Sequence, residues 1–200
     1  MLWGVSGYAQ AGKDTIADRL CDVHGFRRVA FADLLRRCAE ALDPIVGLHI
    51  TPAIEVTSAG DMTPQFIDPD AAVITYTQAL ELYGYEESKS RFPEFRGVLQ
   101  RLGTDVGRKL LSDNIWVDAT LASLEPGVDY VITDARFPNE AEAVTKEGGL
   151  MVRVERIGTG PVNDHPSEVA LDDWAFDHII TNDGTIEELN DKVDRLIRAS

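Results

Sequence analysis

The 200-residue chain has little cysteine, no long apolar run and few positive charges. Its two cysteines, Cys21 and Cys38, are too few for a disulfide framework, so we expect buried thiols in a reducing cytoplasm. No apolar run approaches the roughly 20 residues of a membrane helix, and the first residues lack the pattern of a secretion signal. Lysine and arginine number 19 against 34 acidic residues, and the net charge of −15 argues against polynucleotide binding because phosphates would be repelled.

The composition suits one globular domain over residues 1–200, because 44% of the residues are hydrophobic and no repeat or linker interrupts the chain. We expect strands at residues 2–6, 28–31, 130–133, 150–154 and 178–181. We expect helices at residues 13–25, 33–42, 71–83, 94–111, 114–124, 139–148 and from 185 onward, and an irregular loop over 45–70. This alternation predicts an α/β fold in three layers (α/β/α), with a mostly parallel sheet of about five strands, helices on both faces, and ligands at the carboxyl ends of the strands.

Helical spacing also predicts apolar faces and caps. The expected faces are Ile16, Leu20 and Val23 in the first helix, Leu99, Leu102, Val106 and Leu110 in the helix over 94–111, and Ile186, Leu189, Val193, Leu196 and Ile197 in the last. The expected capping boxes are Asn139 with Glu142 and Thr185 with Glu188.

The most informative segment follows the first strand and reads GYAQAGKDT over residues 7–15. Gly7 and Gly12 permit the positive φ that lets backbone N–H groups turn inward, and the helix that begins near Lys13 adds its unpaired N–H groups. This is the spacing of a phosphate-binding P-loop, in which the lysine reaches the β- and γ-phosphates. The usual motif has Ser or Thr directly after the lysine, whereas here Asp14 stands there and Thr15 follows.

A second motif, TDARFPNE, occupies residues 133–140 at the carboxyl end of an expected buried strand. Asp134 is placed to hold Mg²⁺, directly or through water, and Arg136 to neutralise a phosphoryl group. The alternative is that Asp134 is a turn residue and Arg136 a surface charge.

Six segments in this order carry a family resemblance: GKDTIAD at 12–18, LQRLGTDVGR at 99–108, WV at 116–117, TDARFPNE at 133–140, HPSE at 165–168 and NDGT at 182–185. In these segments the chain resembles the bacteriophage deoxynucleoside monophosphate kinases. The likeness runs through nearly the whole chain and is weakest over 45–95. The P-loop is shared with many kinases, and its combination with TDARFPNE is much more specific.

The resemblance implies a nucleoside-monophosphate-kinase-like fold and ATP-dependent conversion of a deoxynucleoside monophosphate (dNMP) to the diphosphate, with Mg²⁺. It also implies a homodimer in the cytoplasm of an infected host, with small nucleotides as partners and no membrane. Gly7, Ala11, Gly12, Lys13 and Thr15 would then bind ATP. Asp14 would hold Mg²⁺ through water or orient a nearby basic side chain.

Acceptor recognition is expected in a mainly helical region over 33–125. Arg101 and Arg108 lie seven residues apart with Thr104 between them, so on an α-helix they share a face and could clamp a phosphate, or they are a solvated face. Asp33 and one arginine of the neighbouring helix, Arg36 rather than Arg37, are further candidates.

Several other residues keep two interpretations. Arg153 and Arg156 bracket the end of a strand and precede a candidate lid loop over 157–173, where Arg156 would stabilise charge. His165 and Glu168 either recognise the acceptor or order the lid, or they form a helix-capping turn. Asn182 contacts the adenine or forms a turn, and Trp116 stacks on the acceptor base or lies in the core.

Two alternatives to a dNMP kinase stay open at this point. One is another small-molecule P-loop kinase, such as a dephospho-coenzyme A kinase, and the other is a non-catalytic nucleotide-binding regulator. Base selectivity depends on pocket shape, which the sequence does not reveal.

Overall fold

The computed structural model describes residues 1–49, 72–161 and 169–199. The chain divides into two compact units, Met1–Leu34 with Ser112–Ser200 (unit 1) and Leu35–Leu111 (unit 2). Unit 2 falls inside the expected acceptor region 33–125, although residues 112–125 belong to unit 1. Each unit has its own hydrophobic core.

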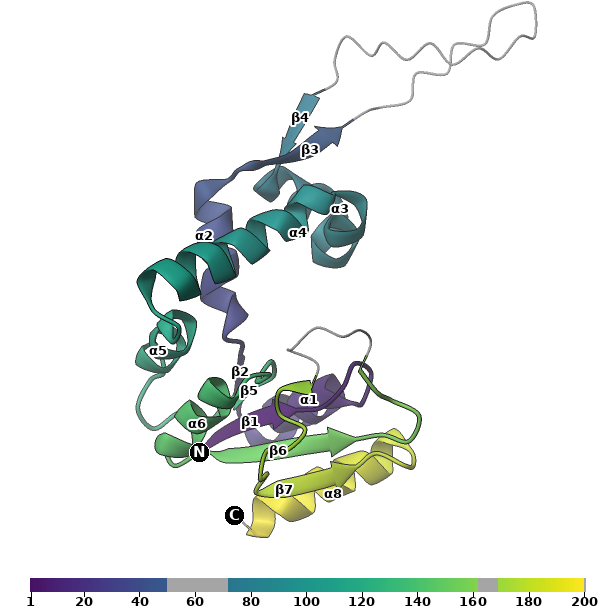
Figure 1. Ribbon diagram of the computed structural model, residues 1–200. Coiled ribbons are helices and arrows are strands. Elements are labelled where there is room, and N and C mark those ends of the chain that lie inside the picture. Colours follow the sequence, from purple (N-terminus) through teal and green to yellow (C-terminus); the bar gives the residue numbers. More distant parts are fainter. Residues whose placement is uncertain (50–71, 162–168, 200) are drawn as a thin grey trace, which may run out of the picture. The chain divides into compact units, whose positions relative to one another are not determined.

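Unit 1 is built on a five-stranded parallel sheet, as the sequence predicts (Figure 1). In spatial order its strands are β2 (Arg27–Val29), β5 (Tyr130–Ile132), β1 (Leu2–Ser6), β6 (Leu150–Glu155) and β7 (His178–Thr181). The strand expected at 28–31 is shorter than predicted, since Ala30 and Phe31 lie beyond it. The central strand β1 pairs with β5 and β6, and Ser6 lies opposite Arg153. The carboxyl ends of these three strands therefore meet at one edge of the sheet.

Helices cover both faces of this sheet. Alternate side chains of β1 point to opposite faces, so Trp3 and Val5 pack with α1 (Lys13–His24) and α8 (Ile186–Ala199). Leu2 packs on the other face with α5 (Ile115–Ala122) and α6 (Pro138–Lys146). The three-layer α/β/α arrangement is confirmed.

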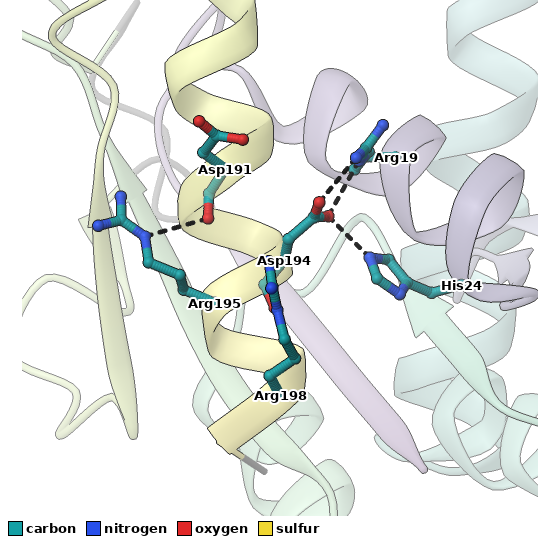
Figure 2. A network of polar contacts seen from close by, with 6 residues as sticks. All are labelled: Arg19, His24, Asp191, Asp194, Arg195 and Arg198. Carbon is teal, nitrogen blue, oxygen red and sulfur yellow. Dashed lines mark hydrogen bonds and ion pairs between the residues drawn. The ribbon is translucent and has the colours of Figure 1, made fainter.

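An ionic network joins α1 to α8 (Figure 2). The Asp194 carboxylate accepts hydrogen bonds from Arg19 at 3.0 and 2.7 Å and lies 2.8 Å from His24 Nε2. These hydrogen bonds hold the pKa of Asp194 well below its usual range. Because α1 begins at the phosphate loop, the network helps fix the direction of that helix.

Some helix details differ from the sequence predictions. Val23 and Ile186, expected in apolar faces, are exposed, and each lies at an end of its helix. The Thr185–Glu188 capping box is confirmed. The Asn139–Glu142 box is wrong, because α6 begins one residue earlier, at Pro138. There the Glu140 carboxylate accepts the N–H groups of residues 136 and 137. Cys21 and Cys38 are free and half-buried rather than fully buried.

Unit 2 contains most of α2 (Ala32–Leu42), a β-hairpin and a helical layer. The hairpin pairs β3 (Ile45–His49) with β4 (Ala72–Thr75) in antiparallel register. The helices are α3 (Tyr76–Arg91), α4 (Pro93–Gln100) and the π-helix η1 (Arg101–Leu111). The core centres on Tyr76 and Phe95, whose rings stack with centroids 4.2 Å apart.

Two predictions in this unit are wrong. The loop expected over 45–70 begins with strand β3, and the helix expected over 71–83 begins only at Tyr76. The reason is that residues 72–75 pair with β3, after which the Thr75 hydroxyl accepts the Gln78 N–H and starts the helix. Residues 50–71 lie outside the described part.

The helix expected over 94–111 is present, but its second half is a π-helix with wider turns. Val106 and Leu110, assigned to its apolar face, are therefore 41% and 75% exposed. The buried positions are instead Gly103 and Gly107. A π-helix does not preserve the stacking of residues seven apart, so the shared face expected for Arg101 and Arg108 is wrong.

Candidate active site

The phosphate loop has the backbone that its glycines predicted. Gly7 has φ +142°, and a Cβ there would lie 2.4 Å from the carbonyl oxygen of Val154. Gly12 has φ +110°, and a Cβ there would lie 2.6 Å from Nδ2 of Asn182. Both positions thus require glycine for conformation and for space. The loop passes so close to β6 and to the residue after β7 that any side chain would push it away.

Lys13 closes the loop on itself. Its Nζ donates to the carbonyl oxygens of Gly7 and Tyr8, each at 2.7 Å. The ammonium group is therefore held over the loop, next to the first turn of α1. The N-cap residue is Gly12, which has no side chain to accept the first N–H groups of the helix. Those N–H groups and the positive end of the helix can therefore bind an anion.

A hollow lies at the carboxyl edge of the sheet, beside the loop. Its charged lining residues come from four segments of unit 1: Lys13, Asp134, Arg136, Arg153 and Asp172. Three cations and two carboxylates thus face one space on a protein whose net charge is −15. Such a concentration of positive charge at a glycine loop suits a phosphorylated ligand.

Arg153 is a buried cation of this hollow. Its side chain is 11% exposed, and its guanidinium donates to the Leu171 carbonyl at 3.1 Å and to Asp172 at 2.8 Å. It also lies over the ring of Tyr8, whose hydroxyl donates to the same Asp172 carboxylate at 2.8 Å. Burial lowers the pKa of Arg153, but the hydrogen bond and charge of Asp172 outweigh it, so the pKa is raised. The hydrogen bond to Asp172 likewise raises the pKa of Tyr8.

The two carboxylates expected to bind magnesium have different surroundings. Asp134 lines the hollow, and its two oxygens accept the N–H groups of Phe31 at 2.8 Å and Ala32 at 3.1 Å. Asp14 is largely exposed and pairs with Arg28, a basic side chain near the loop. Within the described ranges, no three His, Cys, Asp or Glu side chains form a metal cluster. Mg²⁺ in kinases is held mainly by phosphates and water with one or two carboxylates, and Asp134 fits that need.

The remaining predicted residues of unit 1 lie around the loop. Asn182 donates from Nδ2 to the Ala11 carbonyl at 2.8 Å, so it supports the loop. Arg156 is exposed, and its guanidinium lies 3.5 Å from the Gln10 carbonyl. Asp33 accepts the Ala30 N–H at 2.8 Å. Trp116 is 7% exposed, in agreement with a core position.

The candidates in unit 2 are described within that unit alone. Arg36 is half-buried, with its guanidinium carbon 4.9 Å from the centroid of the Tyr85 ring, whereas Arg37 is exposed. Arg101 pairs with Glu94, Thr104 is exposed and Arg108 is half-buried. His165, Glu168 and the middle of the lid loop expected at 157–173, residues 162–168, lie outside the described residues.

Comparison with known proteins identifies the family. The family model for deoxynucleotide monophosphate kinase matches residues 65–193, more than half of the chain. The chain belongs to the deoxynucleotide monophosphate kinase family. It is accordingly a phosphotransferase.

Relatives of this kinase occur in viruses. A protein of Acanthamoeba polyphaga mimivirus, named as a deoxynucleotide monophosphate kinase, is 28% identical over 96% of this chain and 94% of its own length. The deoxynucleotide monophosphate kinase of Escherichia phage RB69 is 35% identical over 52% of this chain and 44% of its own. Among solved structures, shikimate kinase from Aquifex aeolicus aligns with all of this chain and 97% of its own at 11% identity and a TM-score of 0.41.

Sequence reasoning missed three residues of the kinase's hollow. It chose Arg156 over Arg153, and it assigned nothing to Tyr8 or Asp172. Arg153 reaches the site because it pairs with Ser6, the last residue of β1 before the loop, and this pairing of distant strands is not visible in the local sequence. No local pattern marks Asp172, whose partners are 164 and 19 positions away.

Proposed function

We propose that this protein transfers the γ-phosphoryl group of ATP to deoxynucleoside monophosphates, giving ADP and deoxynucleoside diphosphates. The observation that carries this proposal is the hollow beside the glycine loop, which Lys13, Arg136 and Arg153 line, in a chain of the deoxynucleotide monophosphate kinase family. Phosphoryl transfer needs no protein nucleophile. Catalysis is positioning together with stabilisation of the negative charge that spreads over the transferred group.

The residues of unit 1 would act on the donor. The loop N–H groups and Lys13 would bind the β- and γ-phosphates, with Thr15 on a donor phosphate and Asn182 holding the loop in shape. Arg136 and the buried Arg153 would face the charge that develops during transfer. When bound, Mg²⁺ would neutralise the donor phosphates, and Asp134 is the carboxylate of the hollow that suits its water shell.

The acceptor would bind through residues of the region 33–125. Arg36 and one of Arg101 and Arg108, which no longer share a face, are the cations proposed for its phosphate, and Asp33 and Thr104 are the polar groups proposed for its other atoms. We also propose that the enzyme is a homodimer and acts in the cytoplasm of an infected host, supplying precursors for viral DNA synthesis. Sedimentation velocity of the purified protein tests the dimer.

The function is tested by measuring ADP release with ATP, Mg²⁺ and each of the four common dNMPs, with dephospho-coenzyme A as a competing acceptor. We expect turnover with at least one dNMP and none with dephospho-coenzyme A. Lys13→Ala should lower kcat by at least about 100-fold, because a charge aimed at the transferred group is lost. The matched control is Lys146→Ala on the exposed side of α6, which should leave kcat unchanged. Wild-type protein that releases no ADP with any dNMP would contradict the proposal.

A further inference from the structure

The first turn of α2 is held by a carboxylate from a distant part of the chain. Asp134, two residues beyond the end of β5, accepts the Phe31 N–H at Oδ1 and the Ala32 N–H at Oδ2. These donors stand at the start of α2, where a helix has no carbonyl partners of its own for its first N–H groups. The negative charge also lies at the positive end of the helix, which stabilises that end.

Both sides of this contact are anchored in the core of unit 1. Phe31 is 3% exposed and Ala135, next to Asp134, is 2% exposed, and both pack in the same hydrophobic cluster. The local acidic residue Asp33 accepts the N–H of Ala30 and leaves the N–H groups of Phe31 and Ala32 to Asp134. The start of α2 is therefore held by this local contact together with the distant carboxylate of Asp134.

The same side chain also belongs to the phosphate site. Asp134 lines the hollow together with Lys13 and Arg136. The helix that it anchors passes from unit 1 into unit 2 after Leu34 and carries Arg36 about one turn beyond Ala32. The Asp134 carboxylate thus lines the donor hollow and also accepts hydrogen bonds from the first residues of α2, the helix that carries an acceptor candidate.

We propose that Asp134 is a positioning residue that fixes the first turn of α2, the helix that carries the acceptor candidate Arg36, beside the phosphate hollow. The anchoring is independent of any metal, since it consists of two backbone hydrogen bonds. The expected effect on dNMP binding rests on the proposed kinase function. The expected effect on the hydrogen bonds at the start of α2 does not depend on that function.

The anchoring is tested in the nucleotide-free protein with EDTA, by residue-resolved amide hydrogen exchange of the Asp134→Asn variant. Asparagine offers one acceptor and turns an NH₂ group toward the other N–H. Exchange at Phe31 and Ala32 should therefore quicken by about tenfold or more. Asp172→Asn is the matched control, because Asp172 also lines the hollow but accepts from Tyr8 and Arg153. It should leave exchange at Phe31 and Ala32 unchanged. Unchanged exchange in Asp134→Asn would overturn the proposal.

A second variant removes a donor and leaves the carboxylate intact. Ala32 is the first residue of α2, where proline fits the helix but has no N–H to give to Asp134. In Ala32→Pro we expect the KM for dNMP to rise about tenfold, with the Mg²⁺ concentration for half-maximal rate and the KM for ATP unchanged. An unchanged dNMP KM in Ala32→Pro would overturn the part of the proposal that concerns the acceptor. Failure of the proposed function would instead appear as an inactive wild type, with the exchange experiment unaffected.

Discussion

Replacement of Gly7 by alanine tests the phosphate loop most directly, because two separate penalties can be worked from its geometry. Gly7 has φ +142°, which costs an L-residue about 1 kcal/mol or more. The new Cβ would also lie 2.4 Å from the Val154 carbonyl oxygen, and this neighbour is backbone in a central strand that cannot rotate away. Overpacking of that kind costs about 1–3 kcal/mol, so we expect a total of about 3 kcal/mol, or roughly a 100-fold change in the folding equilibrium constant.

The matched control is Gly25→Ala at the end of α1. Gly25 also has positive φ, +74°, but nothing lies within 4 Å of the position that an alanine methyl would take there. Only the conformational penalty of about 1 kcal/mol therefore remains. The difference between the two variants isolates the contact with Val154, at about 2 kcal/mol.

Urea denaturation followed by tryptophan fluorescence measures both variants. All three tryptophans, Trp3, Trp116 and Trp174, lie in unit 1, so the signal reports the unit that contains the loop. The midpoint should fall further for Gly7→Ala than for Gly25→Ala, with the slope unchanged, and ATP binding should weaken only in Gly7→Ala. Equal destabilisation of the two variants would refute the close approach of the loop to β6.

Two further predictions concern the stability of each unit. The lowered pKa of Asp194 means that its ion pairs stabilise the folded state above the unfolded-state pKa of about 4 and lose this contribution as pH falls through the lower folded-state pKa. In Asp194→Asn the free energy of unfolding should therefore be lower than in wild type at pH 7, and the gap should shrink in acid. A gap independent of pH in urea titrations between pH 3 and 7 would contradict this. In unit 2, Phe95 is fully buried against Tyr76, so Phe95→Ala should cost about 3–5 kcal/mol by circular dichroism. The exposed Leu82→Ala should stay within about 0.5 kcal/mol, and similar costs for both would argue against a Phe95-centred core.

The local sequence by itself determined the strands of the parallel sheet, most helices and the phosphate loop. These features depend on residues close together in the chain: the apolar run of β1, the glycines at 7 and 12, Lys13, and the Thr185–Glu188 cap. Short-range sterics and hydrogen bonds decide such elements, so their spacing can be read directly.

Only the tertiary structure decided how the site is completed. The selection of Arg153 over Arg156 depends on β6 lying beside β1, and the anchoring of α2 by Asp134 joins positions more than 100 residues apart. The hairpin of β3 with β4 and the wide turns of η1 likewise arise from pairing and packing inside unit 2. A residue's partner across such distances is set by the folded chain, because no local spacing encodes which distant group will lie within hydrogen-bond reach.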